Sequence, residues 1–259
     1  MVRALGGLTI GAVCALTNCS PFSGSDHAAP AGDAGRSDAG AVVGADAAPS
    51  GPFCMQSAHK LCMDFDDNIL APPPFSARGD GQYLSVVDDG PGKALFIDAL
   101  AAADASGRVA DLVATVPVPA KVTFGFTLTL VGSETQPDHV EIAGFEIQNQ
   151  SLPFVWVIIE GKNFVVVDGT SSNMMDTLYT AALPPPGKPM QLEVAFNLGS
   201  VTSVVVKQDG NVVTVSKPTM LASLVVDPQQ RVACSAGMHY RYTPAAAARY
   251  QLDNVYFDF

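Results

Sequence analysis

Two glutamates on one predicted strand are the first residues in this sequence whose types and spacing could do chemistry. Glu141 and Glu146 bracket the run EIAGFE within the β-prone segment 139–149. Cleavage of a glycosidic bond with retention needs two carboxyl groups about 5–5.5 Å apart. A spacing of five residues puts these side chains on opposite faces of a regular strand. A bulge at Gly144 would bring them to one face, and otherwise they are solvated side chains of a sheet.

Trp156 and His139 are candidates for a ligand patch beside these carboxylates. Trp156 is the only tryptophan of the chain, and flat aromatic rings serve as stacking platforms in sugar-binding clefts. However, Trp156 alternates with Phe154 and Ile158, a pattern that favours packing in the core. The sequence therefore leaves two interpretations of Trp156 open, a core residue and a member of a ligand patch with Glu141 and His139.

Proton transfer next to a uronate is a further chemistry that histidine and tyrosine perform in β-sandwich lyases. His139, His239 and Tyr240 are the candidates for it, but no spacing in the sequence supports the assignment. The sequence has no Gly-x-Ser-x-Gly elbow, phosphate-binding loop or His-Glu-x-x-His zinc helix.

Short β-prone runs separated by turn residues fill the chain from residue 53 onward. The predicted strands are 61–67, 83–89, 93–99, 109–116, 121–131, 139–149, 154–160, 163–169, 190–198, 203–209, 211–216, 231–242 and 250–259. Clean alternation of apolar and polar residues in 121–131 predicts one buried and one wetter face. Segments 160–163 and 208–211 predict tight hairpins. Only 99–105 and 245–248, both rich in alanine, could hold a short helical turn. We expect a sandwich of two antiparallel sheets or a barrel.

Three segments resemble the concanavalin A-like lectin/glucanase jelly roll, a superfamily that includes laminin G-like modules. They are Asp64-Phe65-Asp66-Asp67 on the first predicted strand, Ser235-Ala236-Gly237-Met238 near the end, and the closing Leu252-Asp253-Asn254-Val255-Tyr256. The resemblance spans 53–259 and implies an all-β jelly-roll sandwich of two antiparallel sheets whose first and last strands pair. One fold hosts many functions, so the resemblance does not fix an activity.

The same resemblance bears on Glu141 and Glu146. Family-sixteen hydrolases carry E-x-D-x-E or, with a bulge, E-x-D-x-x-E, in which the outer glutamates are nucleophile and general acid. The longer spacing fits this sequence, but Ala143 stands where the central aspartate tunes the pair. Acid and base roles require two pKa values that are set apart. This departure favours a domain that does not catalyse.

A calcium ion is also implied by the resemblance. In relatives the aspartate that matches Asp253 helps to hold calcium against the N-terminal strand, and Asp66 and Asp67 could supply further ligands. Calcium takes six to eight oxygen ligands, at about 2.3–2.6 Å. The alternative is that Asp253 accepts backbone N–H bonds at a bend and binds no metal.

Cysteine usage predicts one disulfide. Cys54 and Cys62 lie eight residues apart, and in an oxidising compartment they are the expected pair. Cys234 would then be a buried free thiol, whereas the alternative pairing joins Cys54 to Cys234. The spacing does not suit zinc.

The first fifty residues predict export. Residues 1–18 have a positive start and an apolar run of about a dozen residues, as in a secretory signal peptide. Leu16-Thr17-Asn18-Cys19 resembles a bacterial lipobox, which implies cleavage before Cys19 and lipid attachment to its sulfur, although Asn18 departs from the usual small residue. The alternative is an ordinary secreted protein. Residues 19–52, mostly Ala, Gly, Ser, Pro and Asp, predict a flexible linker.

The charge and the export signal also bear on the binding partners and the cellular location of the protein. A formal charge of −11 without a basic cluster argues against nucleic acid. We therefore predict an exported domain, anchored at the outer membrane by its lipid or extracellular, that binds a carbohydrate or another envelope component without catalysis. The alternatives are a divergent glycoside hydrolase or polysaccharide lyase, and a structural interaction module without a small ligand.

Overall fold

The computed structural model describes residues 53–98, 107–132, 139–148, 153–170, 175–197, 204–215, 227, 229–241 and 249–259. The chain divides into the units Met1–Asp46 and Ala47–Phe259, and every described residue belongs to the second. The predicted signal peptide, the lipobox cysteine Cys19 and the linker 19–52 lie outside the described residues. So do both alanine-rich stretches, 99–105 and 245–248. Within the described ranges, no helix has the length and apolar character of a membrane span.

The described chain is built almost entirely from strands, with one short α-helix, α1 (Phe53–Gln56), and one 3-10 helix, η1 (Gly81–Tyr83). The strands are β1 (Leu61–Met63), β2 (Ser76–Gly79), β3 (Leu84–Asp89), β4 (Gly92–Asp98), β5 (Gly107–Pro117), β6 (Lys121–Leu130), β7 (Val140–Gln148), β8 (Phe154–Glu160), β9 (Asn163–Gly169), β10 (Met175–Ala182), β11 (Pro189–Asn197), β12 (Val204–Gln208), β13 (Asn211–Val215), β14 (Arg231–Arg241) and β15 (Arg249–Asp258).

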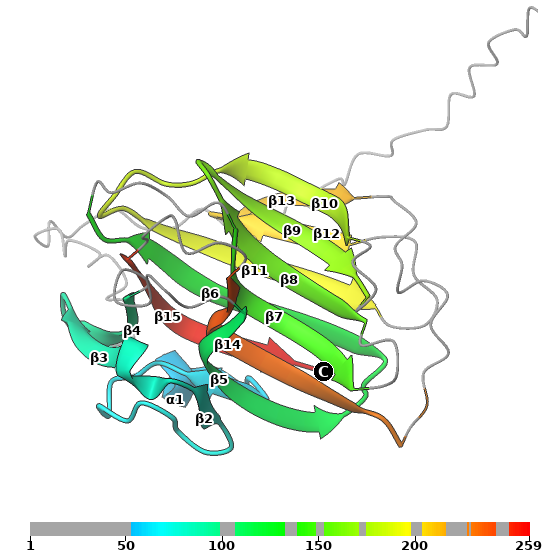
Figure 1. Cartoon of the computed structure of the whole chain (residues 1–259), viewed down its shortest axis with the longest axis horizontal. Coiled ribbons are helices and arrows are strands. Elements are labelled where there is room, and N and C mark those ends of the chain that lie inside the picture. The colour runs from blue at the N-terminus through cyan, green and yellow to red at the C-terminus, as the bar shows by residue number, and fades with distance from the viewer. Residues whose placement is uncertain are drawn as a thin grey trace, which may run out of the picture. The chain divides into compact units, whose positions relative to one another are not determined.

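These strands form two antiparallel sheets, one stacked on the other (Figure 1). The eight-stranded sheet has the order β13-β12-β11-β6-β15-β4-β3, with β1 also paired to β15. The seven-stranded sheet has the order β10-β9-β8-β7-β14-β5-β2. The fold is therefore an all-β jelly-roll sandwich, as predicted, and its first and last strands pair.

The core lies between the two sheets because alternate side chains of each strand point inward. In β6 the predicted apolar face is buried, from Val122 through Leu130 at every second residue. Opposite it, β7 contributes Phe145 and β8 contributes Val157 to the same cluster. The polar face of β6 points away from the core, so each sheet has an outer face on which functional side chains could gather.

Tight turns set the register where the sequence predicted them. Glu160 pairs with Asn163 across the β8–β9 turn, and Gln208 pairs with Asn211 across the β12–β13 turn. Asp209 and Gly210 both have positive φ, as a two-residue hairpin turn of this twist requires.

The structure corrects the expected first strand and adds two strands. β1 ends at Met63, so Asp64, Asp66 and Asp67 follow the strand instead of lying on it. The strands β2 and β10 were not predicted. Both are edge strands with mostly exposed side chains, and only Leu178 of β10 is buried. Without a buried face, neither has the alternation that reveals a strand in sequence.

Candidate functional site

Glu141 and Glu146 lie on the same face of the seven-stranded sheet. Glu141 is opposite Ile158 and Glu146 is opposite Phe154 on the neighbouring strand β8. Residues opposite each other in antiparallel strands point to the same side, and Trp156 lies between these two partners on β8. Both glutamates therefore share the outer face with Trp156.

The bulge that brings the glutamates to one face is not at Gly144. The register of β7 shifts between Glu141 and Ala143, so Ile142 is the extra residue. Gly144 is instead opposite Trp156. A Cβ atom on Gly144 would lie 2.1 Å from the carbonyl oxygen of Val155 and 2.9 Å from Cε3 of Trp156. Gly144 is therefore required for the close approach of the tryptophan ring.

Trp156 is buried, with 1% of its surface exposed. It forms a second apolar cluster with Ile158, Val165 and Val167, apart from the main core. Its ring also stacks on the imidazole of His239, with centroids 4.1 Å apart and planes inclined by 17°. A ring covered in this way is not an open stacking platform, so packing is the better interpretation of Trp156.

A buried ionic network surrounds His239 on this face. Arg78 of β2 donates from Nε and Nη2 to the two carboxylate oxygens of Asp111 of β5, at 2.9 and 2.6 Å. The Nδ1 atom of His239 lies 2.8 Å from Oδ2 of Asp111 and 2.9 Å from Nη2 of Arg78, so the three side chains meet at one point. Arg78 Nη2 also lies 3.4 Å from the hydroxyl of Ser235. We call Arg78, Asp111, Glu141, Trp156 and His239 the sheet-face cluster.

The charges in the sheet-face cluster stabilise one another. Burial alone would raise the pKa of Asp111, but hydrogen bonds from His239 and Arg78 outweigh it and lower the pKa below its ordinary value of 3.8. The hydrogen bond to Asp111 is also the main reason why the pKa of Arg78 is raised, and the nearby charge of Glu146 adds to it. Asp111 is thus ionised at neutral pH and holds the Arg78 and His239 side chains in place.

Glu141 lies between two histidines. Its carboxylate oxygens are 4.0 Å from Nε2 of His139 and 3.9 Å from Nε2 of His239. Only 6% of Glu141 is exposed. Ala143, where the resemblance implies a tuning aspartate, is buried in the core between the sheets. The structure therefore brings Glu141, His139, His239 and Trp156 together, in a closed arrangement.

Sequence reasoning missed Arg78, Asp111 and Ser235 as members of this face. A signal for Asp111 was present, since it is the only charged residue in the apolar run VADLVATV. Arg78 gave no signal because β2 was not predicted. The side chain of Tyr240 lies outside the described part of the chain.

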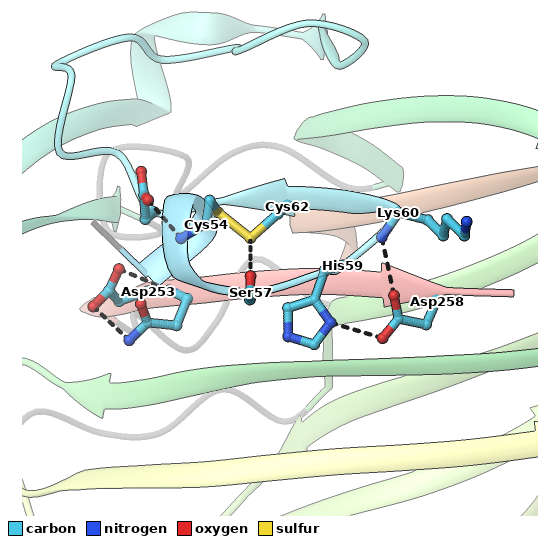
Figure 2. The surroundings of a disulfide bond; sticks show 9 residues. Cys54, Ser57, His59, Lys60, Cys62, Asp253 and Asp258 are labelled. Carbon is cyan, nitrogen blue, oxygen red and sulfur yellow. Dashed lines mark hydrogen bonds and ion pairs between the residues drawn. A yellow bond between two sulfur atoms is a disulfide. The ribbon is translucent and has the colours of Figure 1, made fainter. Parts of the chain in front are cut away.

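The predicted calcium ligands lie near the disulfide but do not form a metal group. Asp253 accepts hydrogen bonds from the backbone N–H of Asn254 at 2.7 Å and from its side-chain amide at 3.0 Å (Figure 2). Asp66 accepts a backbone bond from Lys93, and Asp67 is exposed. Burial and then the charges of Asp66, Asp89 and Asp64 raise the pKa of Asp253 to about 7. In the described ranges no three His, Cys, Asp or Glu side chains converge on a common point.

The predicted disulfide between Cys54 and Cys62 is present, and it closes the segment that precedes β1 (Figure 2). Two contacts to Asp258 of β15 hold this segment against the sheet. His59 Nδ1 lies 2.7 Å from Oδ2 of Asp258, and the backbone N–H of Lys60 donates to Oδ1 at 3.0 Å. Cys234 is a buried free thiol, as expected, and burial raises its pKa.

A cavity of about 400 Å³ lies over the outer face of the eight-stranded sheet. On the β15 side its lining residues include Phe53, His59 and Tyr256. On the far side, across β6, they include Glu193 of β11, Lys207 of β12 and Asp209 of the β12–β13 turn. We call it the Glu193 cavity. None of the predicted catalytic, ligand-binding or metal residues lines it, because its walls come from strands far apart in the chain.

One row of paired residues runs beneath the Glu193 cavity, and three of its four members line the cavity. Tyr256, Gly125, Glu193 and Lys207 are opposite one another on β15, β6, β11 and β12. The tyrosine ring lies on Gly125, where a Cβ atom would come within 2.6 Å of it, and His59 stacks on the ring with centroids 3.8 Å apart. The tyrosine hydroxyl donates to Glu193, which also pairs with Nζ of Lys207 at 2.6 Å.

The Glu193 carboxylate is kept ionised by these partners. Burial would raise its pKa, but the hydrogen bonds from Lys207 and Tyr256 lower it overall. Burial, followed by the contact with Glu193, raises the pKa of Tyr256, so the phenol keeps its proton. Side-chain exposures of 26% for Glu193 and 45% for Lys207 leave the ion pair accessible from the cavity. The cavity thus offers an ionic donor–acceptor pair opposite a group of aromatic rings.

Comparison with known proteins finds no protein-family model and no curated protein sequence that matches the chain. Solved structures with similar folds do match. The cellulose induced protein Cip1 has 12% identity and a TM-score of 0.51 over 76% of this chain and 96% of that chain. A conserved carbohydrate esterase from the Shiga toxin-encoding bacteriophage phi24B has 14% identity and a TM-score of 0.50, over 77% and 97%. At these identities the likeness shows the fold and does not transfer an activity.

Proposed function

We propose that residues 53–259 form a carbohydrate-binding domain that does not catalyse, and that the Glu193 cavity is its ligand site. The observation that carries the proposal is the two-sided lining of this cavity, with Phe53, His59 and Tyr256 on one side and the Glu193–Lys207 pair on the other. Sugars present apolar C–H patches and hydroxyl groups that both donate and accept hydrogen bonds. Sites with an apolar wall and a few placed polar groups suit such ligands.

The names of two similar structures are consistent with this proposal, since one is a cellulose induced protein and the other a carbohydrate esterase. We further propose that the domain is exported and held at the outer membrane by a lipid on Cys19, with residues 19–52 as its tether. Calcium is not part of the proposal, because Asp66, Asp67 and Asp253 do not fit a metal group.

A glycan array probed with the full-length chain in detergent, together with a reducing-sugar assay, tests the proposed function. We expect binding to at least one glycan without release of reducing ends. The variant Phe53→Ala should weaken binding because it removes an aromatic wall of the cavity. Absence of any binding on the array would contradict the proposal and favour a structural interaction module.

A divergent hydrolase or lyase is the second candidate function, because Glu141 and Glu146 share one face with the Asp111–His239 pair. Turnover in the same assays that is abolished in Glu141→Gln, while Phe53→Ala stays active, would favour this alternative. The burial of Glu141 and Trp156 argues against it, since a polysaccharide cannot reach the Glu141 carboxylate when it is closed off from solvent.

A further inference from the structure

The Glu193 cavity has the features needed to define the chemistry of its ligand, and this inference rests on the proposed function. We propose that the cavity binds a single neutral pyranose through two adjacent hydroxyl groups, and that it discriminates against uronates. The size of the cavity, its ion pair and the charge of its lining support this proposal.

The size of the cavity favours a short ligand. Its volume of about 400 Å³ is near the lower end of the roughly 300–1,000 Å³ typical of small-molecule sites. One side is closed by the disulfide segment, which Asp258 holds in place through His59 and Lys60. A cavity closed on one side receives the end of a glycan more easily than an internal stretch of a long chain.

The Glu193–Lys207 pair fits two neighbouring hydroxyl groups. The carboxylate accepts hydrogen bonds and the ammonium donates them, and the two groups are held 2.6 Å apart as cross-strand neighbours. Each hydroxyl of a vicinal diol can donate to the carboxylate or accept from the ammonium, so one diol satisfies both charged groups. Tyr256 fixes the carboxylate from the opposite side, so the pair is preorganised before the ligand arrives.

The rest of the lining disfavours an anionic sugar. Asp209 adds a second carboxylate, whose Oδ1 accepts the backbone N–H of Gln191 at 2.9 Å. Lys207, the cation of the lining described above, is already paired to Glu193. A uronate would therefore meet the carboxylates of Glu193 and Asp209, and the ammonium of Lys207 would already be paired with Glu193. Repulsion between like charges in a half-buried site opposes its binding.

The test compares methyl glycosides by calorimetry with the full-length chain in detergent. The probes are methyl glucoside, methyl galactoside and methyl mannoside, the 2-, 3- and 4-deoxy forms of whichever binds best, and the methyl glycoside of glucuronic acid. We expect one neutral glycoside to bind and glucuronate to bind at least roughly tenfold more weakly. Two of the three deoxy forms should also bind roughly tenfold more weakly than the parent glycoside, because a missing hydroxyl leaves a polar group of the site unpaired.

Lys207→Met and Glu193→Gln should each weaken binding of the neutral glycoside by roughly tenfold or more. Lys93→Met is the matched control. Lys93 pairs with the exposed Asp88 at 2.7 Å, close to the 2.6 Å between Lys207 and Glu193, but it does not line the cavity. It should leave binding unchanged. Thermal unfolding of all three variants checks that they are folded.

The outcomes separate this inference from the proposed function. If glucuronate binds as tightly as the neutral glycosides, or if every deoxy form binds normally, the inferred ligand chemistry is wrong while carbohydrate binding stands. If neutral glycosides bind the folded Lys207→Met and Glu193→Gln variants as tightly as the parent, the site is elsewhere. If neither the glycosides nor the glycan array shows binding, the proposed function fails as well.

Discussion

The imidazole of His239 lies parallel to the indole of Trp156, at a centroid distance of 4.1 Å. Asp111 holds one nitrogen of this imidazole, and Glu141 faces the other. The tryptophan therefore acts as a packing surface for a buried ionic network on the outer face of a sheet.

Replacing Trp156 by alanine should destabilise the domain by about 3–5 kcal/mol, the usual cost of removing a large buried ring. Trp156→Phe should cost less, because it keeps part of the contact with His239 and Ile158. Urea unfolding followed by circular dichroism measures both changes. An unfolding midpoint for Trp156→Ala equal to that of the parent protein would show that the ring is not buried.

Replacing Asp111 by asparagine should lower stability by about 3–5 kcal/mol at pH 7, because it removes the buried anionic partner of the half-buried Arg78 and the buried His239. The pKa of Asp111 is lower in the folded state than its ordinary value of 3.8. Its carboxylate therefore contributes stability above pH 4, and this contribution is lost as the pH falls through the folded pKa.

Urea unfolding of the parent and of Asp111→Asn between pH 7 and pH 2.5 measures this dependence. The difference between the two proteins should be constant above about pH 5 and shrink at the acidic end. Asp88→Asn is the control, since Asp88 is exposed and its pair with Lys93 contributes little. A difference that is independent of pH would contradict an ionised Asp111.

Replacing Gly144 by alanine should destabilise the domain by about 1–3 kcal/mol or more. The new methyl group would overlap the carbonyl of Val155 and the ring of Trp156. Gly81→Ala is a matched control, because a Cβ atom there meets no atom within 4 Å. Thermal unfolding of the two variants should separate them clearly, and equal melting temperatures would refute the close packing of Trp156 on Gly144.

Removing the disulfide with Cys54→Ser and Cys62→Ser should cost about 2.5 kcal/mol, as expected for a bridge between residues eight apart. The parent protein in reducing agent should show the same loss of stability.

Cys234 should not react with thiol reagents in the folded protein, because burial raises its pKa and covers its sulfur. Labelling of Cys234 at the rate of an unfolded thiol would contradict its place in the core.

Alternation of side chains predicted most of the strands, and the two-sheet fold followed from it. The hairpins at 160–163 and 208–211 were also predictable, because their turn residues have local preferences. Two edge strands, β2 and β10, were not predicted, and both bury few side chains. The sites depend on which strands are neighbours, and sequence alone does not give this pairing.

The outer face of the seven-stranded sheet illustrates this limit. Glu141 and Glu146 share a face only because Ile142 bulges, and the sequence pointed to Gly144 instead. The Glu193 cavity is a stronger example. The row beneath it joins Gly125, Glu193, Lys207 and Tyr256 across four strands, and no spacing along the chain indicates that row.

The last strand, β15, lies between β6 and β4 within the eight-stranded sheet and also pairs with β1. While residues 249–259 of a nascent chain are still inside the ribosome, β6 and β4 therefore have no strand between them to join them. Contacts between distant segments form late and slowly. The eight-stranded sheet should therefore stay incomplete until residues 249–259 have left the ribosome, whatever has folded before them.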